Sequence, residues 1–116
     1  MEPKVLQEHI EAALSQSSTD AHITFRPMFG GILGYCDGRP FVSLSNVGLA
    51  FKLSAKDQEE LLSQSGADRL RYEPSDPPSK QYIVVPERFL RDQATLAGWM
   101  ERSLKYARSL PVKKRK

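Results

Sequence analysis

Apolar residues near the start of the chain recur with the period of an α-helix. Within residues 3–16 they fall on one face of a repeat of about 3.6 residues, at Leu6, Ile10, Ala13 and Leu14. Serine, threonine and aspartate then crowd together over residues 15–20, and their side chains compete for backbone hydrogen bonds. The pattern predicts an amphipathic helix over residues 3–16, followed by a loop.

The period changes to two in the middle of the chain, which is typical of β-strands. We expect a strand at Ile23–Met28 and one strand on each side of Asp37-Gly38, the second of them around residues 41–44. A further strand is expected around residues 49–53. Aspartate followed by glycine tolerates the left-handed backbone that a two-residue hairpin turn needs. Since Leu49, Phe51 and Leu53 alternate onto one face, the pattern predicts an antiparallel meander with one buried side.

A second helix is predicted to begin after Ser54. Ser54 and Asp57 have the spacing of a capping box, in which Asp57 reaches back to the helix start. Leu61 and Leu62 are its apolar residues, and Gly66 is its expected C-terminal stop.

A last strand and a last helix complete the predicted elements. A proline-rich loop at residues 73–79 precedes the β-branched segment 82–85, which Pro86 ends because proline lacks an amide hydrogen. Asp92 is the expected N-cap of the final helix. Its apolar stripe is centred on Leu96, Ala97, Met100, Leu104 and Ala107, with Trp99, Tyr106 and Leu110 along one edge.

These elements predict an α+β fold of two layers. We expect an antiparallel sheet of about five strands, packed by the N-terminal, middle and C-terminal helices. Residues 1–110 should form a single domain, and residues 111–116 a flexible basic tail. The predicted core comprises Leu6, Ile10, Phe41, Phe51, Leu53, Ile83, Leu96, Met100 and Leu104.

Charge and composition narrow the classes of function. The net charge is +3, but the last four residues, Lys113, Lys114, Arg115 and Lys116, are all basic, so residues 1–112 carry −1. This near-neutral body lacks the cationic excess of most nucleic-acid-binding domains. No apolar run approaches the ~20 residues of a membrane span, and the N-terminus lacks a signal-peptide pattern. We therefore expect a cytoplasmic protein that makes no membrane contact.

Candidate catalytic side chains are few. His9 and His22 are the only histidines and have no ligand or triad spacing, although Asp20 with His22 leaves a weak metal alternative on ligand type. Cys36, the single cysteine, cannot form an intramolecular disulfide, and the neighbouring Asp37 should raise its thiol pKa. The sequence predicts no enzyme activity, no cofactor and no metal.

A glycine-rich segment follows the first predicted strand. Gly30-Gly31 with Gly34 is not a phosphate-binding loop, because no Lys-Ser or Lys-Thr follows and the segment opens a strand. We interpret these glycines as structural, allowing a bulge or a close backbone crossing.

The chain resembles the N-terminal domain of TfoX/Sxy, a family of bacterial competence regulators. The resemblance covers roughly residues 5–108 and is carried by Arg26-Pro27-Met28-Phe29-Gly30-Gly31, Gly34-Tyr35, Asp37-Gly38, Phe41, Phe51-Lys52, Val85-Pro86-Glu87, Leu96, Trp99 and Ala107. Met28-Phe29-Gly30-Gly31 is the most specific element. The resemblance implies an α+β fold, no catalytic activity, and transcriptional coactivation through protein contacts, notably with the cyclic-AMP receptor protein. We expect a stand-alone domain without the C-terminal helical domain of the full regulators.

Two functional hypotheses remain open. In the first, the chain is a regulatory protein-interaction module that uses the sheet and the last helix, with Trp99, Arg102 and Tyr106 as candidate contacts. For Trp99 and Tyr106 this interface competes with the interpretation that the sequence favours, in which both belong to the core. In the second hypothesis, the chain is an accessory nucleic-acid binder that uses the basic C-terminal helix and tail, since residues 102–116 hold seven basic residues and no acid. The sequence also leaves a homodimer open.

Overall fold

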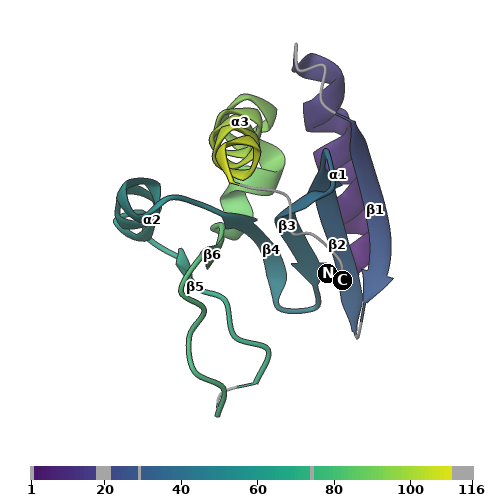
Figure 1. The fold of residues 1–116 in the computed structure, drawn as a ribbon. Coiled ribbons are helices and arrows are strands. Elements are labelled where there is room, and N and C mark those ends of the chain that lie inside the picture. The colour runs from purple at the N-terminus through teal and green to yellow at the C-terminus, as the bar shows by residue number, and fades with distance from the viewer. Residues whose placement is uncertain (1, 18–21, 29, 74, 111–116) are drawn as a thin grey trace.

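The computed structural model describes residues 2–17, 22–28, 30–73 and 75–110. In this part of the chain, three α-helices and one short 3₁₀-helix pack a six-stranded antiparallel sheet (Figure 1). In chain order the elements are α1 (Pro3–Gln16), β1 (Ile23–Met28), β2 (Gly31–Cys36), β3 (Arg39–Ser45), β4 (Gly48–Lys52), α2 (Ala55–Leu62), β5 (Asp68–Arg69), β6 (Tyr82–Val84), η1 (Glu87–Arg91) and α3 (Gln93–Ser109). The predicted α+β class is confirmed.

The strands lie in the order β1-β2-β3-β4-β6-β5, and every neighbouring pair is antiparallel. Residues directly opposite each other in antiparallel strands point to the same face. One row across the sheet comprises Phe25, Gly34, Val42, Phe51, Ile83 and Arg69. This row faces the helices, because Val42, Phe51 and Ile83 are fully buried in the core.

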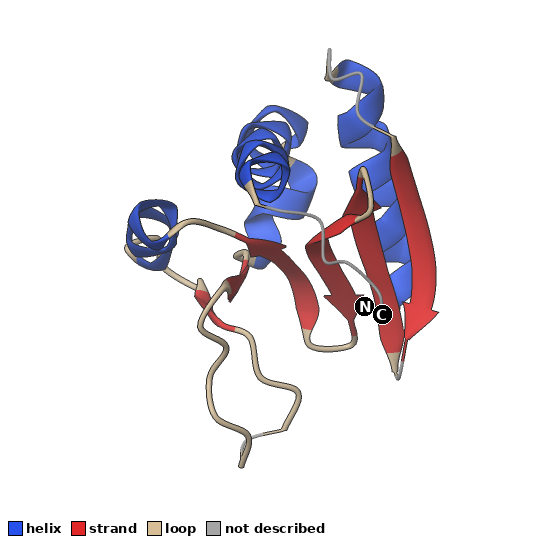
Figure 2. Cartoon of the chain, viewed as in Figure 1, coloured by secondary structure: helices blue, strands red, loops and turns tan. Residues whose placement is uncertain are grey.

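The helices form the second layer on this face (Figure 2). α1 lies behind β1 and β2 and packs against α3, while α2 lies toward the β6–β5 end of the sheet. Arg69 belongs to the helix-facing row and donates to Oε1 of Gln58 in α2 at 2.9 Å. The nine predicted core residues are all buried, with exposures of 0–3%, so this prediction is confirmed.

No helix in the described part of the chain covers the opposite face of the sheet, which we call the open face. A second cross-strand row lies there, formed by Arg26, Leu33, Ser43, Ala50, Val84 and Asp68. Its two ends are charged, and its two central residues are small. Ser43 and Ala50 are nevertheless buried, with exposures of 4% and 0%, so neighbouring side chains must cover them.

A buried serine joins α3 to the sheet. The Ser103 hydroxyl is fully buried and lies 2.7 Å from the carbonyl oxygen of Phe41 and 2.8 Å from that of Lys52. It can donate to either carbonyl, so it fixes the distance between α3 and the strands β3 and β4. The sequence pattern did not single out this residue.

Replacement of Ser103 by alanine is expected to lower the free energy of unfolding by about 2 kcal/mol, because it removes a buried hydrogen-bond donor that the strand carbonyls share. Urea unfolding of the two proteins checks this value. Ser109→Ala is the matched control, since the Ser109 hydroxyl is exposed and donates to the Tyr106 carbonyl one turn earlier on the same helix. Equal losses for the two variants would contradict a special role for Ser103.

Several predicted turns and caps can be compared directly with the structure. Asp37 and Gly38 have φ values of 52° and 82°, which confirms the predicted hairpin turn. Asp92 caps α3 by accepting from the Thr95 amide at 3.2 Å, as predicted. The prediction of a capping box for α2 was right for Ser54 and wrong for Asp57. Ser54 accepts from the Asp57 amide at 3.3 Å, but the Asp57 carboxylate turns to Arg102 on α3.

Two boundaries also differ from the sequence prediction. α2 ends at Leu62, before Gly66, where the Ser63 hydroxyl donates to the carbonyl of Glu60. The following residues, expected to be a loop, form the two-residue strand β5 beside β6, and the Leu70 amide donates to the Tyr82 carbonyl just beyond it. Two residues cannot display a period, which explains why the sixth strand was missed.

Candidate interaction surface

The open face is hollowed into a groove of about 320 Å³. Its lining comprises Leu33, Ser43, Leu70, Arg71, Tyr72, Asp76, Pro77, Ser79 and Tyr82. The floor is the small residue Ser43, and Leu33 of β2 stands on one side. On the other side lie Tyr82 of β6 and residues of the connection between β5 and β6, from which the Tyr72 hydroxyl reaches Ser43. The groove is therefore built by one loop and three strands that are distant in sequence.

Three tyrosines lie together on this face. The Tyr72 hydroxyl is 2.9 Å from Oγ of Ser43, which fixes the loop to β3, while the Tyr72 side chain remains exposed, at 54% of the residue. Burial raises the pKa of Tyr82, and the neighbouring phenols of Tyr72 and Tyr35 raise it further. Tyr82 therefore keeps its proton at any physiological pH and stays a hydrogen-bond donor.

The charged side chains around the groove differ in whether they already have a hydrogen-bonding partner. Asp76 accepts from the Glu73 amide at 3.2 Å, and Asp68 in β5 accepts from the amide of its neighbour Arg69 at 2.7 Å, so both carboxylates contact nearby backbone. The guanidinium of Arg26 lies over the Tyr35 ring, 5.5 Å from its centroid. Arg71 is half-buried in the groove lining and has no hydrogen bond or ion pair among residues 2–17, 22–28, 30–73 and 75–110.

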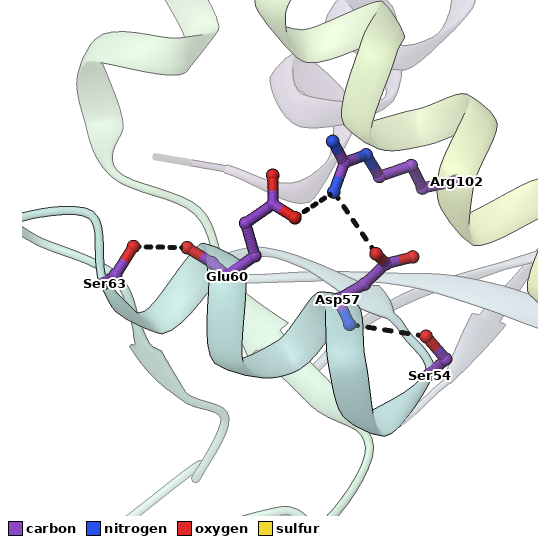
Figure 3. A network of polar contacts seen from close by, with 5 residues as sticks. All are labelled: Ser54, Asp57, Glu60, Ser63 and Arg102. Carbon is purple, nitrogen blue, oxygen red and sulfur yellow. Dashed lines mark hydrogen bonds and ion pairs between the residues drawn. The ribbon is translucent and has the colours of Figure 1, made fainter.

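The contacts expected on the last helix are mostly internal. Trp99 is 8% exposed and belongs to the core cluster, which agrees with its core interpretation. Arg102 lies over the Trp99 ring at 4.3 Å and forms ion pairs with Asp57 at 3.2 Å and Glu60 at 3.0 Å (Figure 3). Arg102 thus joins α3 to α2. Tyr106 is half-buried, and its hydroxyl lies 3.5 Å from Nε2 of Gln81.

The ion pairs of Arg102 give stability a weak pH dependence. The hydrogen bond from Arg102 lowers the pKa of Glu60. A carboxyl whose pKa is lowered on folding stabilises the protein above its unfolded pKa of about 4.3, and this contribution disappears as pH falls through the folded pKa. The pair is exposed, so the effect should be small and sensitive to salt.

Glu60→Gln is therefore expected to lower the Tm slightly near about pH 6. The difference from the parent should shrink as pH falls below the unfolded pKa of about 4.3, and should vanish once pH has passed the lowered folded pKa. Thermal unfolding at low and high salt over this range checks the result. Glu59→Gln is the matched control, because Glu59 is the neighbouring exposed acid of α2. A Tm difference that persists at low pH would exclude the ion pair as its cause.

The glycine-rich segment lies at one end of the open face. Met28 ends β1 and is 53% exposed, Gly30 has a φ of 68°, and Phe29 lies outside the described residues. A Cβ at Gly31 would meet the carbonyl oxygen of Leu44. The register between β2 and β3 shifts between Gly34 and Tyr35, whose partners are Val42 and Pro40, so the extra residue of this irregularity is Phe41 on β3. The arrangement is that of a closely packed hairpin.

Candidate chemical groups do not converge in the described residues. His9 is half-buried on α1, and the exposed His22 offers its backbone amide to Asp37 at 2.9 Å. Cys36 is fully buried, and burial first, then Asp37, raise its thiol pKa. The described part of the chain holds no group of three or more side chains suited to bind a metal. Asp20 and the basic residues Lys113, Lys114, Arg115 and Lys116 lie outside it.

Sequence reasoning named the sheet as a contact surface but missed the residues that shape it, namely Tyr35, Tyr72, Tyr82 and Arg71. A signal existed for Tyr82, because it alternates with the buried Ile83 and must therefore point away from the helices.

Among the helices that the structure describes, none has the length and apolar character that a membrane crossing requires.

Comparison with known proteins identifies the family to which the chain is similar. The TfoX N-terminal domain family matches residues 15–107, from the end of α1 to the last turns of α3. No curated protein and no solved structure matches the chain. The family match includes every strand and therefore the whole open face. With most of its 116 residues matched, the chain belongs to the TfoX N-terminal domain family.

Proposed function

We propose that the chain is a non-enzymatic protein-interaction module that acts in the regulation of transcription or competence in the bacterial cytoplasm. Membership of the TfoX N-terminal domain family supports this class of function. The observation that carries the proposal is the open face, where an exposed Tyr72, a shaped groove and arginines lie on the side of the sheet that no described helix covers. Tyrosine and arginine are the residue types that concentrate binding energy at protein interfaces.

The expected partner is a protein of the transcription machinery. By family resemblance the cyclic-AMP receptor protein is the first candidate. A second copy of the chain is another, since β1 is a six-residue edge strand. Pro27 within β1 removes one backbone donor and so disfavours pairing through this edge. A face-to-face contact on the open face agrees better with this geometry.

Capture from a nuclease-treated bacterial lysate by the immobilised full chain tests the proposal. A specific protein should be retained by the parent and by Val5→Glu, but lost with Tyr72→Glu. The two variants are matched, because each places a charge at an exposed apolar position, 40% exposed on α1 and 54% on the open face. Retention of nucleic acid alone, or of no macromolecule at all, would refute a protein-interaction module.

The alternative function is accessory nucleic-acid binding through the end of α3 and the tail. Exposed Lys105 and Arg108 on α3 favour it, although Arg108 also forms an ion pair with Asp37 at 3.6 Å. Four terminal cations supply only a weak, salt-sensitive contact. We expect deletion of residues 112–116 to leave the Tm and the captured protein unchanged. Submicromolar binding to duplex DNA at about 150 mM salt that is lost with the tail would favour the alternative.

A further inference from the structure

We infer that the groove on the open face binds an extended, acidic segment of a partner protein that carries one apolar anchor residue. The inference rests on the proposed protein-interaction function and specifies the site and the chemistry of the partner. It depends on the shape of the groove, on the charges left available around it, and on the spacing across the sheet.

The shape of the groove suits one apolar side chain. Its volume is about 320 Å³, and Leu33, Leu70, Pro77 and the rings of Tyr72 and Tyr82 form most of its surface. An anchor of leucine or phenylalanine size would displace water from this surface, which stabilises the complex in proportion to the apolar area covered. The Tyr82 hydroxyl, which keeps its proton, would offer a donor to a backbone carbonyl of the bound segment.

The side chains around the groove differ in how far their hydrogen-bonding needs are met. Asp76, which also lines the groove, and Asp68 in β5 each keep their negative charge and accept one hydrogen bond from a nearby backbone amide. Arg71, in contrast, lines the groove without a hydrogen bond or ion pair in the described part of the chain. Its planar guanidinium matches the geometry of a carboxylate, and a half-buried pair is screened less than a fully exposed one. A carboxylate of the partner would therefore give Arg71 the hydrogen-bonding group that the described residues do not supply.

A second arginine sets the spacing of the acids. The open-face row joins Arg26, Leu33 and Ser43 on three adjacent strands. Two strand spacings amount to roughly 10 Å, the length of about three extended residues. Arg26 stacks on Tyr35 with its guanidinium accessible at this end of the row. The bound segment should thus place acids on both sides of its anchor, within about three positions.

A selection from a random library of displayed 12-residue peptides on the full, immobilised chain tests the inference. The parent should enrich peptides in which Asp or Glu flanks a leucine, isoleucine or phenylalanine. Arg71→Glu should weaken binding of the best acidic peptide at least tenfold by fluorescence anisotropy, and should enrich Lys or Arg at the same position. Arg91→Glu is the matched control, because Arg91 is an exposed arginine on η1 outside the groove. It should select the same acidic peptides as the parent.

The outcomes separate the inference from the proposed function. Peptides that are enriched equally by the parent and by Arg71→Glu would overturn the groove assignment, while lysate capture would still support a protein-interaction module. Absence of any enrichment would also overturn it. A fluorescein-labelled oligothymidylate that competes with the peptide and binds more tightly would assign the face to single-stranded nucleic acid instead. Equal thermal unfolding of the three proteins ensures that lost binding reflects charge.

Discussion

Truncation of Leu104 to alanine is expected to lower the free energy of unfolding by about 2–5 kcal/mol, the range for a buried leucine. Leu104 is 3% exposed and packs in the cluster between α3 and the sheet. The loss combines the transfer free energy of the deleted atoms with the cost of a cavity that a closely packed core cannot fill. This is the largest single effect we expect from the chain. It is a large part of the total stability of a typical domain, which is only about 5–15 kcal/mol.

Urea unfolding followed by circular dichroism measures this loss. Lys105→Ala is the matched control, because Lys105 is the next residue of α3 and its side chain is exposed. Alanine is a good helix former at both positions, so helix propensity contributes little to the comparison. The control should stay within about 0.5 kcal/mol of the parent. A Leu104→Ala protein as stable as its control would exclude the packing described for α3.

The regular elements were predictable because local pattern and tertiary packing agree. The helix expected at residues 3–16 is α1, and the strand expected at Ile23–Met28 is β1, with the same bounds. In α1 the apolar period matches the buried face, formed by Leu6, Ile10 and Ala13, whereas the residues of the edge strand β1 are half-buried or exposed. The Asp37-Gly38 turn was predictable for a different reason, since its left-handed backbone limits the choice of residue.

The mistakes lie where tertiary contacts outweigh local preference. Asp57 has a local partner at the start of α2, but an arginine 45 residues away offers its carboxylate a charged hydrogen bond. The strand β5 exists only because β6 lies beside it. Neither outcome can be read from a window of neighbouring residues.

The candidate site was only partly predictable for the same reason. For the aromatic residues of the last helix the sequence favoured the core over an interface, and Trp99 does belong to the core. The open face instead depends on a hydrogen bond between Ser43 and Tyr72, which are 29 residues apart. A loop rich in proline gives no periodic signal of the strand it will cover. Alternation along β6 was the one pattern that indicated an outward tyrosine.

Replacement of Gly34 by valine is expected to lower the free energy of unfolding by about 3 kcal/mol, near the upper end of the range for over-packed cores. A Cβ at this position would lie 2.6 Å from Cγ1 of Val42, 3.1 Å from Cε1 of Phe25 and 3.2 Å from Cε1 of Phe41. Strand propensity favours valine over glycine by up to about 1 kcal/mol. Steric overlap should dominate, because Val42 is β-branched and cannot rotate away. Gly34→Ala should cost less, since it adds only the Cβ.

A double-mutant cycle with Val42→Ala identifies the cause of the loss. Val42→Ala alone should destabilise by cavity formation, but it also removes the atom nearest to the added Cβ. The combined Gly34→Ala and Val42→Ala protein should therefore lose less than the two single variants together, with a coupling of about 1 kcal/mol. Leu61→Ala, in the buried part of α2, serves as the control partner, and its effect should add to that of Gly34→Ala. Additive losses in both cycles would show that Val42 does not require glycine at position 34, and that the backbone of β2 relaxes around a side chain.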